Sequence, residues 1–424
     1  MCLGFSLSAA MAQVDNISNM SAEWMRTGAR NAATDAADIV VYNPAGLTKM
    51  KDGLHVNIGN QFLFRKPVHE YDLGMGAGMQ KRGQDGSDPF LPNLYAAWKK
   101  NNWALFTGFF ISGGGATENY TKGSINTDLI GMMAVMSSQG AYSEAKDQML
   151  KASSYYMTTT AGGTYAFSDK VSMACAMRYT SAVNKTEAGV TLTSSPIDYP
   201  DMPLTLNTEE TASGISGVIS MNVTPSDKCN FSIRYETQVK LDFETKQNHD
   251  DFGMTTDGSM HRRDLPAVLA IGAGFKANDK MKLFAETNYY FQKNADWGKS
   301  STVTNEMAWS EMAGDAVTYA MGMQYAINDR FMASCGGGFT NYMWKDKAGY
   351  YTSAGVFEVG HNDNFNVNTG MACKITDKVM LNAGYMHTFW ADQTIKAMNA
   401  QPMDVDVKVK NSLNAVALGV EIGF

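Results

Sequence analysis

The sequence predicts an all-β fold, a transmembrane antiparallel β-barrel of about fourteen strands. Three observations support this prediction. A short turn motif recurs at nearly even spacing, the segments beside it alternate between apolar and polar residues, and the chain ends on Phe424 within such a segment. A transmembrane strand needs only about 10 residues, and half of its side chains can be polar. A chain of 424 residues can form one large barrel of this kind.

The turn motif consists of a small polar residue, then Asp, then a base. Asp and Asn favour tight turns because their side chains bond the local backbone. Successive Asp residues of the motif are 58, 52, 50 and 48 positions apart, which fits two strands and one long loop per unit. The five copies are Ser168-Asp169-Lys170, Ser226-Asp227-Lys228, Asn278-Asp279-Lys280, Asn328-Asp329-Arg330 and Thr376-Asp377-Lys378, and residues 99–102, KKNN, are an earlier variant.

The segments beside the turns alternate with the period of a strand. After Asp227, an apolar set from Cys229 to Tyr235 opposes a polar set that contains Arg234 and Glu236. The same analysis gives fourteen strands, and the longest connections between them are the polar segments 66–90, 113–152 and 294–313. The strands are near 54–65, 91–99, 102–112, 153–168, 171–190, 208–224, 228–245, 261–277, 280–293, 314–327, 330–342, 362–375, 378–390 and 409–424.

Short turns at one end and long loops at the other are typical of outer-membrane barrels. The alternative is a large soluble β-sandwich or propeller, which predicts roughly even loops and purely apolar inner faces. Charges such as Arg178, Lys282 and Glu421 on the second face favour the barrel. Aromatic residues make up 11 % of the chain and suit interfacial belts.

The first residues, MCLGFSLSAAMA, are small and apolar and end in Ala10-Met11-Ala12, an A-x-A cleavage pattern. We therefore expect residues 1–12 to be the remnant of a signal peptide that lacks its basic start, with Gln13 as the mature start. The net charge of −7 is scattered and no basic stripe is present, which argues against nucleic-acid binding.

Two segments resemble the FadL/TodX family of outer-membrane transport proteins. Residues 24–47, WMRTGARNAATDAADIVVYNPAGL, are similar to the N-terminal hatch of that family, and the hatch motif Asn43-Pro44-Ala45-Gly46 is the most specific part. Residues 91–120, LPNLYAAWKKNNWALFTGFFISGGGATENY, resemble the family's second and third strands and the loop that follows.

The resemblance implies a fourteen-stranded barrel, residues 51–424, plugged by a small N-terminal hatch, residues 13–50. Family members pass long-chain fatty acids or aromatic hydrocarbons, and a kink in the third strand opens the barrel wall sideways. An open barrel of this size would leak without a plug. The alternative for residues 13–50 is a disordered periplasmic tail.

The third predicted strand runs into Gly113-Gly114-Gly115, and glycine within a strand marks a bulge, a bend or a weakened ladder. One interpretation is the lateral-gate kink that the resemblance implies, with Gly108 as a secondary candidate. The other is a flexible strand end at a loop.

In the next loop, Leu129, Met132, Met133 and Met136 fall at helical spacing. Methionine suits adaptable apolar surfaces. These residues predict either a loop groove that binds hydrophobic ligands or a helix that packs on the barrel rim.

No catalytic motif, metal-ligand spacing or cofactor motif is present, so we expect no enzyme, no metal and no cofactor. The six His are dispersed, and four of the Cys fall on the predicted lipid-facing side close to turns. Luminal bases such as Arg178 or Arg234 could pair with luminal acids or hold a ligand carboxylate. The sequence does not place either base at a pocket.

The first functional hypothesis is passive uptake of hydrophobic small molecules across the outer membrane of a Gram-negative bacterium. A general porin for polar solutes and a structural or adhesive barrel are the alternatives. The expected partners are the hydrophobic ligand, outer-membrane lipid with lipopolysaccharide, and the barrel-assembly machinery. The barrel is expected to be a monomer.

Overall fold

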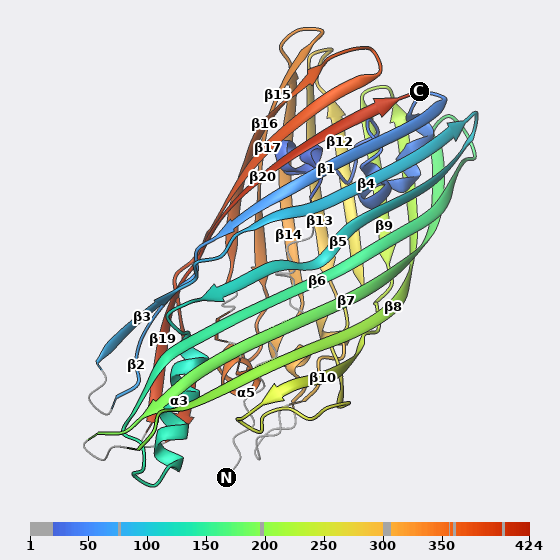
Figure 1. Cartoon of the computed structure of the whole chain (residues 1–424). Helices are drawn as coiled ribbons and strands as arrows, with labels where there is room; N and C mark the ends of the chain where they lie inside the picture. The colour runs from blue at the N-terminus through green and yellow to red at the C-terminus, as the bar shows by residue number, and fades with distance from the viewer. Residues whose placement is uncertain are drawn as a thin grey trace.

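The computed structural model describes residues 20–74, 78–195, 199–299, 307–355, 357–358, 362–400 and 403–424. Fourteen strands within these ranges form a closed antiparallel barrel, which the pairing of β8 with β9 completes (Figure 1). The fourteen-stranded fold predicted from the sequence is therefore confirmed. The expected signal-peptide remnant, residues 1–12, and the expected start at Gln13 lie outside the described residues.

The wall strands follow one another around the barrel in chain order, and β20 returns to pair with β1. They are β1 (Gly53–Arg65), β4 (Asp88–Lys100), β5 (Trp103–Tyr120), β6 (Glu144–Ala166), β7 (Val171–Thr193), β8 (Met202–Ser226), β9 (Cys229–Glu236), β12 (Val268–Lys276), β13 (Met281–Tyr290), β14 (Ala316–Ala326), β15 (Phe331–Tyr342), β16 (Asn364–Lys374), β17 (Val379–Trp390) and β20 (Ser412–Gly423).

The alternation in the sequence separates the two faces of the wall. On β7, Met173 and Met177 face outward and are exposed, whereas Ser172 and Arg178 face the lumen and are buried. Exposed aromatic residues gather near both strand ends, in the arrangement of the two interfacial girdles of a transmembrane barrel. Those near the short turns are Trp98, Tyr165, Phe167, Phe275, Tyr325 and Phe331, and those toward the other end are Tyr179, Tyr235, Tyr319, Phe339, Phe365 and Phe389.

The short turns lie at the barrel end that carries the C-terminus, the upper end in Figure 1. Each turn is fixed by its first residue. The side-chain Oδ1 of Asn278 accepts hydrogen bonds from the backbone N–H groups of Lys280 (2.9 Å) and Met281 (3.0 Å), and Asn328 does the same for Arg330 and Phe331. These Asx turns explain why the motif recurs between paired strands.

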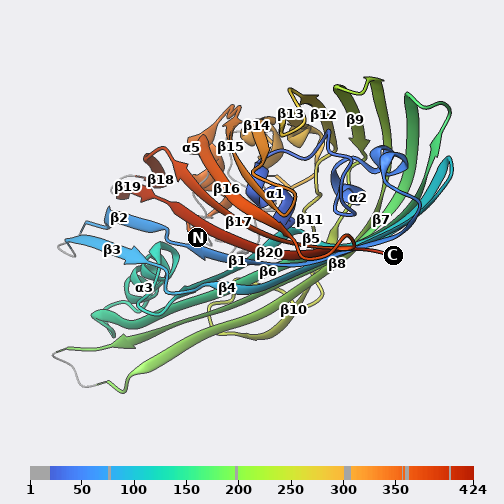
Figure 2. The same cartoon turned by 90° about the horizontal axis from the view of Figure 1, so that it is seen from above.

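The long loops at the opposite end fold into a cap with its own small sheet, ordered β18-β19-β2-β3 (Figures 1 and 2). The sequence does not predict this sheet, because it indicates a polar loop over 66–90. Tyr71, Tyr351, Phe357 and Val407 form part of the apolar core of the cap. Its elements are β2 (Val68–Asp72), β3 (Met79–Gly83), α3 (Ile125–Ser137), η2 (Gln292–Asn294), α4 (Trp309–Ala313), α5 (Lys347–Ala354), β18 (Gln393–Ala400) and β19 (Met403–Lys410).

The segment expected as one strand over 228–245 is interrupted. β9 ends at Glu236, and β10 (Asp242–Asp250) continues beyond an inward excursion, with β11 (Met260–Arg262) beside it. The excursion lies over the inner face of β8, where a Cβ on Gly214 would collide with the carbonyl oxygen of Lys240. The carboxylate of Asp264 accepts the backbone N–H of Leu241 at 3.0 Å and holds the excursion in place.

Among the described residues, no helix is both long and apolar enough to cross a membrane. The described cysteines, Cys175, Cys229, Cys335 and Cys373, are free thiols. All four lie on the outward register of their strands, as their alternation predicted.

A charge at the middle of the outer wall is expected to destabilise the barrel in a bilayer. Ile271 is 45 % exposed and lies in the centre of β12. Replacing Ile271→Arg should cost about 2–4 kcal/mol, the usual penalty for a base at the bilayer midplane. Urea unfolding of the reconstituted protein would measure this change, with Ile271→Leu as the control. Equal stability of the two variants would contradict a lipid-facing position.

Candidate functional site

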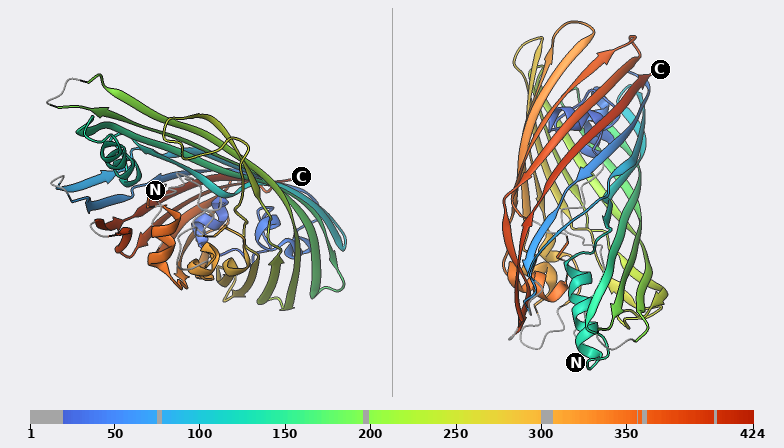
Figure 3. Two further views of the ribbon diagram at one scale, coloured as in Figure 1. Left: turned by 90° about the horizontal axis from the view of Figure 1, so that it is seen from below. Right: turned by 60° about the vertical axis from the view of Figure 1, so that its left-hand side comes forward.

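Residues 20–50 form a compact segment, here called the hatch, inside the barrel near the short-turn end (Figures 2 and 3). It contains α1 (Ala22–Thr27), α2 (Ile39–Tyr42) and the 3₁₀ helix η1 (Pro44–Lys49). Ser21 caps α1 by accepting the backbone N–H of Trp24 at 3.0 Å. Gly28 ends α1 in the left-handed conformation, at φ 72°.

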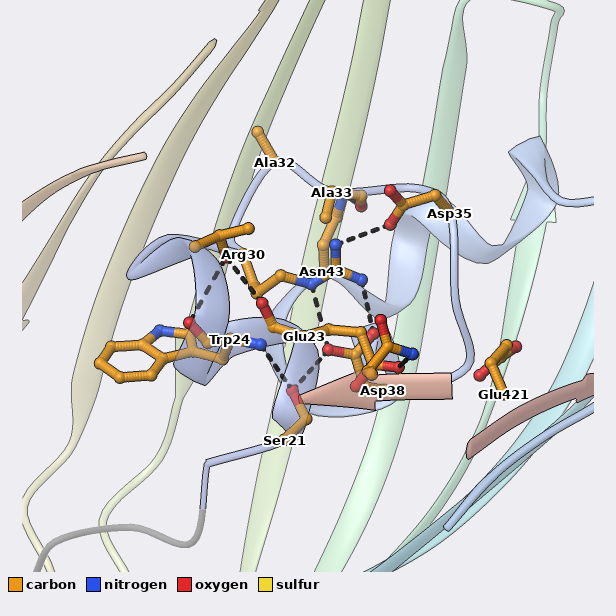
Figure 4. A network of polar contacts seen from close by, with 12 residues as sticks. Ser21, Glu23, Trp24, Arg30, Ala32, Ala33, Asp35, Asp38, Asn43 and Glu421 are labelled. Atoms are coloured by element: carbon orange, nitrogen blue, oxygen red, sulfur yellow. Dashed lines mark hydrogen bonds and ion pairs between the residues drawn. The ribbon is translucent and has the colours of Figure 1, made fainter. Parts of the chain in front are cut away.

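Arg30 is the internal centre of the hatch (Figure 4). Its guanidinium is fully buried and binds Asp38 through two hydrogen bonds, of 3.1 and 2.6 Å, and Asp35 through one of 2.7 Å. Ser21 Oγ donates to Asp38 Oδ2 at 2.7 Å. Because an uncompensated buried charge is very costly, this cluster fixes the path of the loop between α1 and α2.

The sequence motif Asn43-Pro44-Ala45-Gly46 lies at the start of η1 and is fully buried. The Asn43 amide donates to the carbonyl of Ala33 (3.0 Å) and to Asn222 Oδ1 on β8 (2.8 Å). Thr164 on β6 donates to the Pro44 carbonyl at 2.8 Å, and Ser172 on β7 donates to the Ala45 carbonyl at 2.7 Å. A Cβ on Gly46 would stand 2.5 Å from the Asn43 amide nitrogen. The motif therefore joins the hatch to three adjacent wall strands.

Wall carboxylates also bind the hatch. Glu286 on β13 accepts the backbone N–H groups of Arg30 and Asn31, each at 2.7 Å, and Glu421 on β20 accepts the N–H of Ala37 at 3.0 Å.

The hatch also places a carboxylate of its own against the wall. Glu23 Oε1 accepts the side-chain amides of Asn57 on β1 and Asn382 on β17, each at 2.7 Å. Burial, with a smaller contribution from Asp38, raises the pKa of Glu23 to about 7. A proton on this carboxyl would lower the cost of burying it between the wall and the hatch.

A row of wall glycines allows the hatch to approach the barrel closely. A Cβ at Gly336 would collide with the carbonyl oxygen of Thr27, and one at Gly384 would stand 2.6 Å from the backbone nitrogen of Arg26. The row crosses β12, β14, β15, β16 and β17. It consists of Gly272, Gly322, Gly336, Gly370 and Gly384.

A cavity of about 280 Å³ lies in the lumen on the cap side of the hatch. It is near the lower limit for small-molecule sites, which measure roughly 300–1,000 Å³. Its walls combine aromatic and aliphatic side chains with neutral Ser, Thr and Asn and a few charged groups. Trp24 and Tyr42 of the hatch, Phe110 and Ser112 of β5, and Trp390 of β17 are among the lining residues.

A second cavity, of about 580 Å³, borders the opposite side of the hatch. Arg26, Thr34 and Asp35 of the hatch line it, together with wall residues near the short turns such as Lys378. The hatch therefore separates two luminal spaces.

Arg178 on β7 and Arg234 on β9 face the first cavity and share one carboxylate, Glu236. Both guanidinium groups also donate to the carbonyl of Val41 in the hatch, and Arg178 lies over the ring of Phe110, 5.3 Å from its centroid. The Nε atoms of both side chains are buried without a hydrogen-bond partner. Sequence alternation placed these bases in the lumen, but only the three-dimensional pairing of β7, β8 and β9 places them at the cavity.

Strand pairing in the barrel wall becomes irregular beside this cavity. The hydrogen-bonded ladder between β4 and β5 begins at the pair of Lys100 with Trp103 and ends at the pair of Leu94 with Phe109. In contrast, β5 continues to pair with β6 as far as Tyr120. Two bulges interrupt the β5–β6 register, at Ile111/Gly113 and Gly114/Ala116. Gly114 has φ 64°, and a Cβ there would collide with the carbonyl oxygen of Ser154. The predicted residues Gly113, Gly114 and Gly115 thus lie at the bend where β5 departs from β4 (Figure 1).

The two strands meet again closer to the cap. The backbone N–H of Thr117 on β5 donates to Asp88 Oδ1 on β4 at 2.8 Å, and the N–H of Asp85 donates to the carbonyl of Asn119 at 2.8 Å. The segment between the β4–β5 ladder and the Thr117–Asp88 bond is here called the wall window. Its β5 side is residues 110–116 and its β4 side is residues 89–93.

The predicted groove residues lie on helix α3 of the cap but do not share one surface. Leu129 is fully buried in the cap core, and Met132 packs against the same core. Met133 packs against a separate cluster that includes Tyr120 and Leu150, and Met136 is exposed. In the described part of the chain, no cluster of three or more His, Cys, Asp or Glu has metal-binding geometry.

Removing the hatch is expected to open a water route through the barrel, because the segment separates the two luminal cavities. Deleting residues 13–50 should leave a folded barrel, judged by heat-modifiable migration, and raise the leakage of small hydrophilic solutes from vesicles. Gly336→Val offers a milder test, since it displaces α1 without removing it. Unchanged permeability in both folded variants would show that the hatch does not plug the lumen.

No family model and no curated protein matches this sequence. Solved structures do match its fold. The crystal structure of a Pseudomonas aeruginosa FadL homologue has a TM-score of 0.69 at 12 % identity, over 98 % of this chain and 100 % of that one.

Two toluene transporters are similar at 12 % identity. The P. putida transporter TodX has a TM-score of 0.62 over 93 % of this chain and 96 % of its own. The Ralstonia pickettii transporter TbuX has a TM-score of 0.60 over 97 % and 100 %. The chain therefore has the fold of a FadL-like barrel with an N-terminal hatch, as the resemblance in its sequence implies.

Proposed function

We propose that the protein is an outer-membrane channel for the passive uptake of hydrophobic small molecules, long-chain fatty acids or similar compounds, with lateral release through the barrel wall. The observation that carries this proposal is the position of the luminal cavity. The hatch closes the cavity on one side, and Phe110 and Ser112 at the wall window border it on another. A ligand in the cavity is thus blocked along the barrel axis and lies next to the bend in β5.

The outer surface supports a membrane location. In a bilayer every backbone polar group needs an internal partner, and a closed barrel satisfies this requirement. The apolar outward register and the two sets of aromatic residues match the lipid-facing band of outer-membrane barrels. The solved structures with this fold include a FadL homologue and toluene transporters.

Lateral release suits an apolar ligand energetically. Apolar surface exposed to water costs about 25 cal/mol per Å². The described contacts between the hatch and the window strands are apolar, since Met25 clusters with Leu91 and Ile111. A ligand that leaves through the wall window would enter the membrane without crossing periplasmic water. This route needs no energy source.

The charged groups of the cavity favour a ligand with a carboxylate. Arg178 and Arg234 share a single acid, Glu236, so this cluster has one positive charge in excess. The other acid at the cavity, Glu286, already accepts two backbone N–H groups of the hatch. A carboxylate could accept charge-assisted hydrogen bonds from the two guanidinium groups that line the cavity while its chain occupies the aromatic part.

A general porin is the alternative function. A stable and large ion conductance of the intact protein in a planar bilayer would favour it over the plugged channel. Substrate identification by mass spectrometry of lipid that copurifies in mild detergent would name the ligand class directly.

Filling the bend in β5 is expected to stop transport and leave assembly intact. Val at Gly113, Gly114 and Gly115, singly and together, should abolish uptake of a labelled long-chain fatty acid. A Cβ at Gly114 would collide with the carbonyl oxygen of Ser154, so β5 would have to move at the window. The matched control is Gly217→Val on β8, where a Cβ meets nothing within 4 Å. Heat-modifiable migration checks folding. Folded bend variants with normal uptake would place the exit elsewhere.

Removing one cavity base is expected to weaken fatty-acid binding selectively. A hydrogen bond to a charged group contributes about 1.5–3 kcal/mol. Arg234→Gln or Arg178→Gln should therefore raise the Kd for oleate by roughly ten- to a hundredfold and change the Kd for toluene less than twofold. The control is Arg330→Gln in an exposed turn. Equal losses for both ligands would indicate that the bases support the cavity without contacting a carboxylate.

A further inference from the structure

The geometry of the short turns explains only part of their repeated motif. The first residue is needed because its side chain accepts the N–H of the third residue, as in Thr376 with Lys378 at 3.2 Å and Ser168 with Lys170 at 3.3 Å. The third residue contributes only its backbone to these bonds. Nothing in the turn requires a base at that position, yet all five motifs have one.

These five bases are here called the basic rim. All five are exposed, and in the described part of the chain none of them forms an ion pair. Two neighbouring bases do form ion pairs. Lys276 pairs with the motif acid Asp279 at 2.8 Å, and Lys374 pairs with the motif acid Asp377 at 2.6 Å. The basic rim is Lys170, Lys228, Lys280, Arg330 and Lys378.

The whole short-turn end is basic, in contrast to the chain as a whole. Outside the lumen it carries eleven bases against six acidic side chains, whereas the formal net charge of the protein is −7. The bases are Lys49, Lys51, Lys99, Lys100, Lys276, Lys374 and the five of the rim, and the acids are Asp52, Asp169, Asp227, Asp279, Asp329 and Asp377. Positive charge is therefore concentrated at the end that carries the hatch.

The rim lies beside the aromatic residues of the same end. Tyr165 and Phe167 precede Lys170 by a few positions, and Phe275 and Phe331 are as close to Lys280 and Arg330. Interfacial aromatic residues lie at the level of the lipid headgroups. Lysine and arginine side chains are long enough to reach that level from a turn just beyond it.

We propose that the basic rim binds the headgroups of anionic phospholipids in the leaflet at the short-turn end of the barrel. The inference rests on the proposed membrane location. Each exposed base near an anionic membrane surface adds an attraction that falls off within a Debye length. Spacing the bases on successive hairpins distributes them around the circumference, where lipids surround the barrel. The rim thus recognises phosphate-bearing lipid and sets the depth of the barrel at this end.

Tryptophan quenching by brominated lipids tests the proposal. Trp98 and Trp103 stand at the short-turn end, where their rings pack edge to face with centroids 5.0 Å apart. The protein is reconstituted in two sets of vesicles, both mixtures of phosphatidylcholine and phosphatidylglycerol. Either the phosphatidylglycerol or the phosphatidylcholine is brominated, and the quenching of tryptophan fluorescence in the two sets gives the lipid preference. We expect about a fivefold preference for phosphatidylglycerol at low salt. The preference should fall at high salt and disappear when all five rim bases become Gln.

The matched control removes five exposed bases of the cap side, Lys66, Lys81, Lys122, Lys151 and Lys246, and should keep the preference. A variant with only Lys170, Lys228 and Lys280 changed to Gln provides an intermediate value if the fivefold variant folds poorly. Equal quenching by the two lipids, or a preference that survives loss of the rim, overturns the proposal. If the rim binds an acidic protein and not a lipid, the two lipids should quench the fluorescence equally. Absence of quenching by brominated phosphatidylcholine would instead contradict the membrane location itself.

Discussion

Backbone hydrogen bonding is the constraint on which the rest of this structure depends. The wall satisfies its own N–H and C=O groups by closing on itself, but the hatch is irregular backbone inside the barrel and must find partners elsewhere. Polar side chains of the inner face supply them. Asn368 donates to the Met25 carbonyl at 2.9 Å, Asn230 donates to the Ala32 carbonyl at 2.9 Å, and Glu286 accepts from the backbone of Arg30. The polar half of each alternating strand is therefore the binding surface for the hatch.

The same constraint shapes the wall window. Where β5 departs from β4, a straight strand would leave a row of ladder groups to be satisfied in apolar surroundings. Two bulges interrupt the register there, and the left-handed Gly114 turns the strand while it keeps its pairing with β6. At the cap side a side chain replaces the ladder, since Asp88 accepts the backbone N–H of Thr117. The wall window is thus bounded at both ends by hydrogen bonds.

Local patterns in the sequence predicted the strands, the turns and the face of the wall on which each side chain lies. These features depend only on residues that are close together in the sequence. The set from Cys229 to Tyr235 faces outward as expected. The cap sheet was not predicted, since β2 pairs with β19 across more than 300 positions and each strand is short. The inward excursion after Glu236 was also missed, because it depends on Gly214 of β8 and on Asp264. Arg178 and Arg234 were predicted to be luminal, but their shared carboxylate is a tertiary feature.

The hatch makes different kinds of contact with different parts of the barrel wall. Toward β6–β9 and β13–β20 they include hydrogen bonds to Asn, Ser and Glu and close packing on glycines such as Gly336 and Gly384. Apolar contacts accompany these bonds, since Met25 also clusters with Met386 and Leu413. Toward β4 and β5 the described contacts are apolar, because Ile39 and Val40 cluster with Tyr95, Phe106 and Phe110. Directional bonds resist displacement, whereas an apolar interface can admit another apolar surface at little cost. A hydrophobic ligand would therefore separate the hatch from the wall most easily on the side of the wall window, which is the side from which we propose that it leaves.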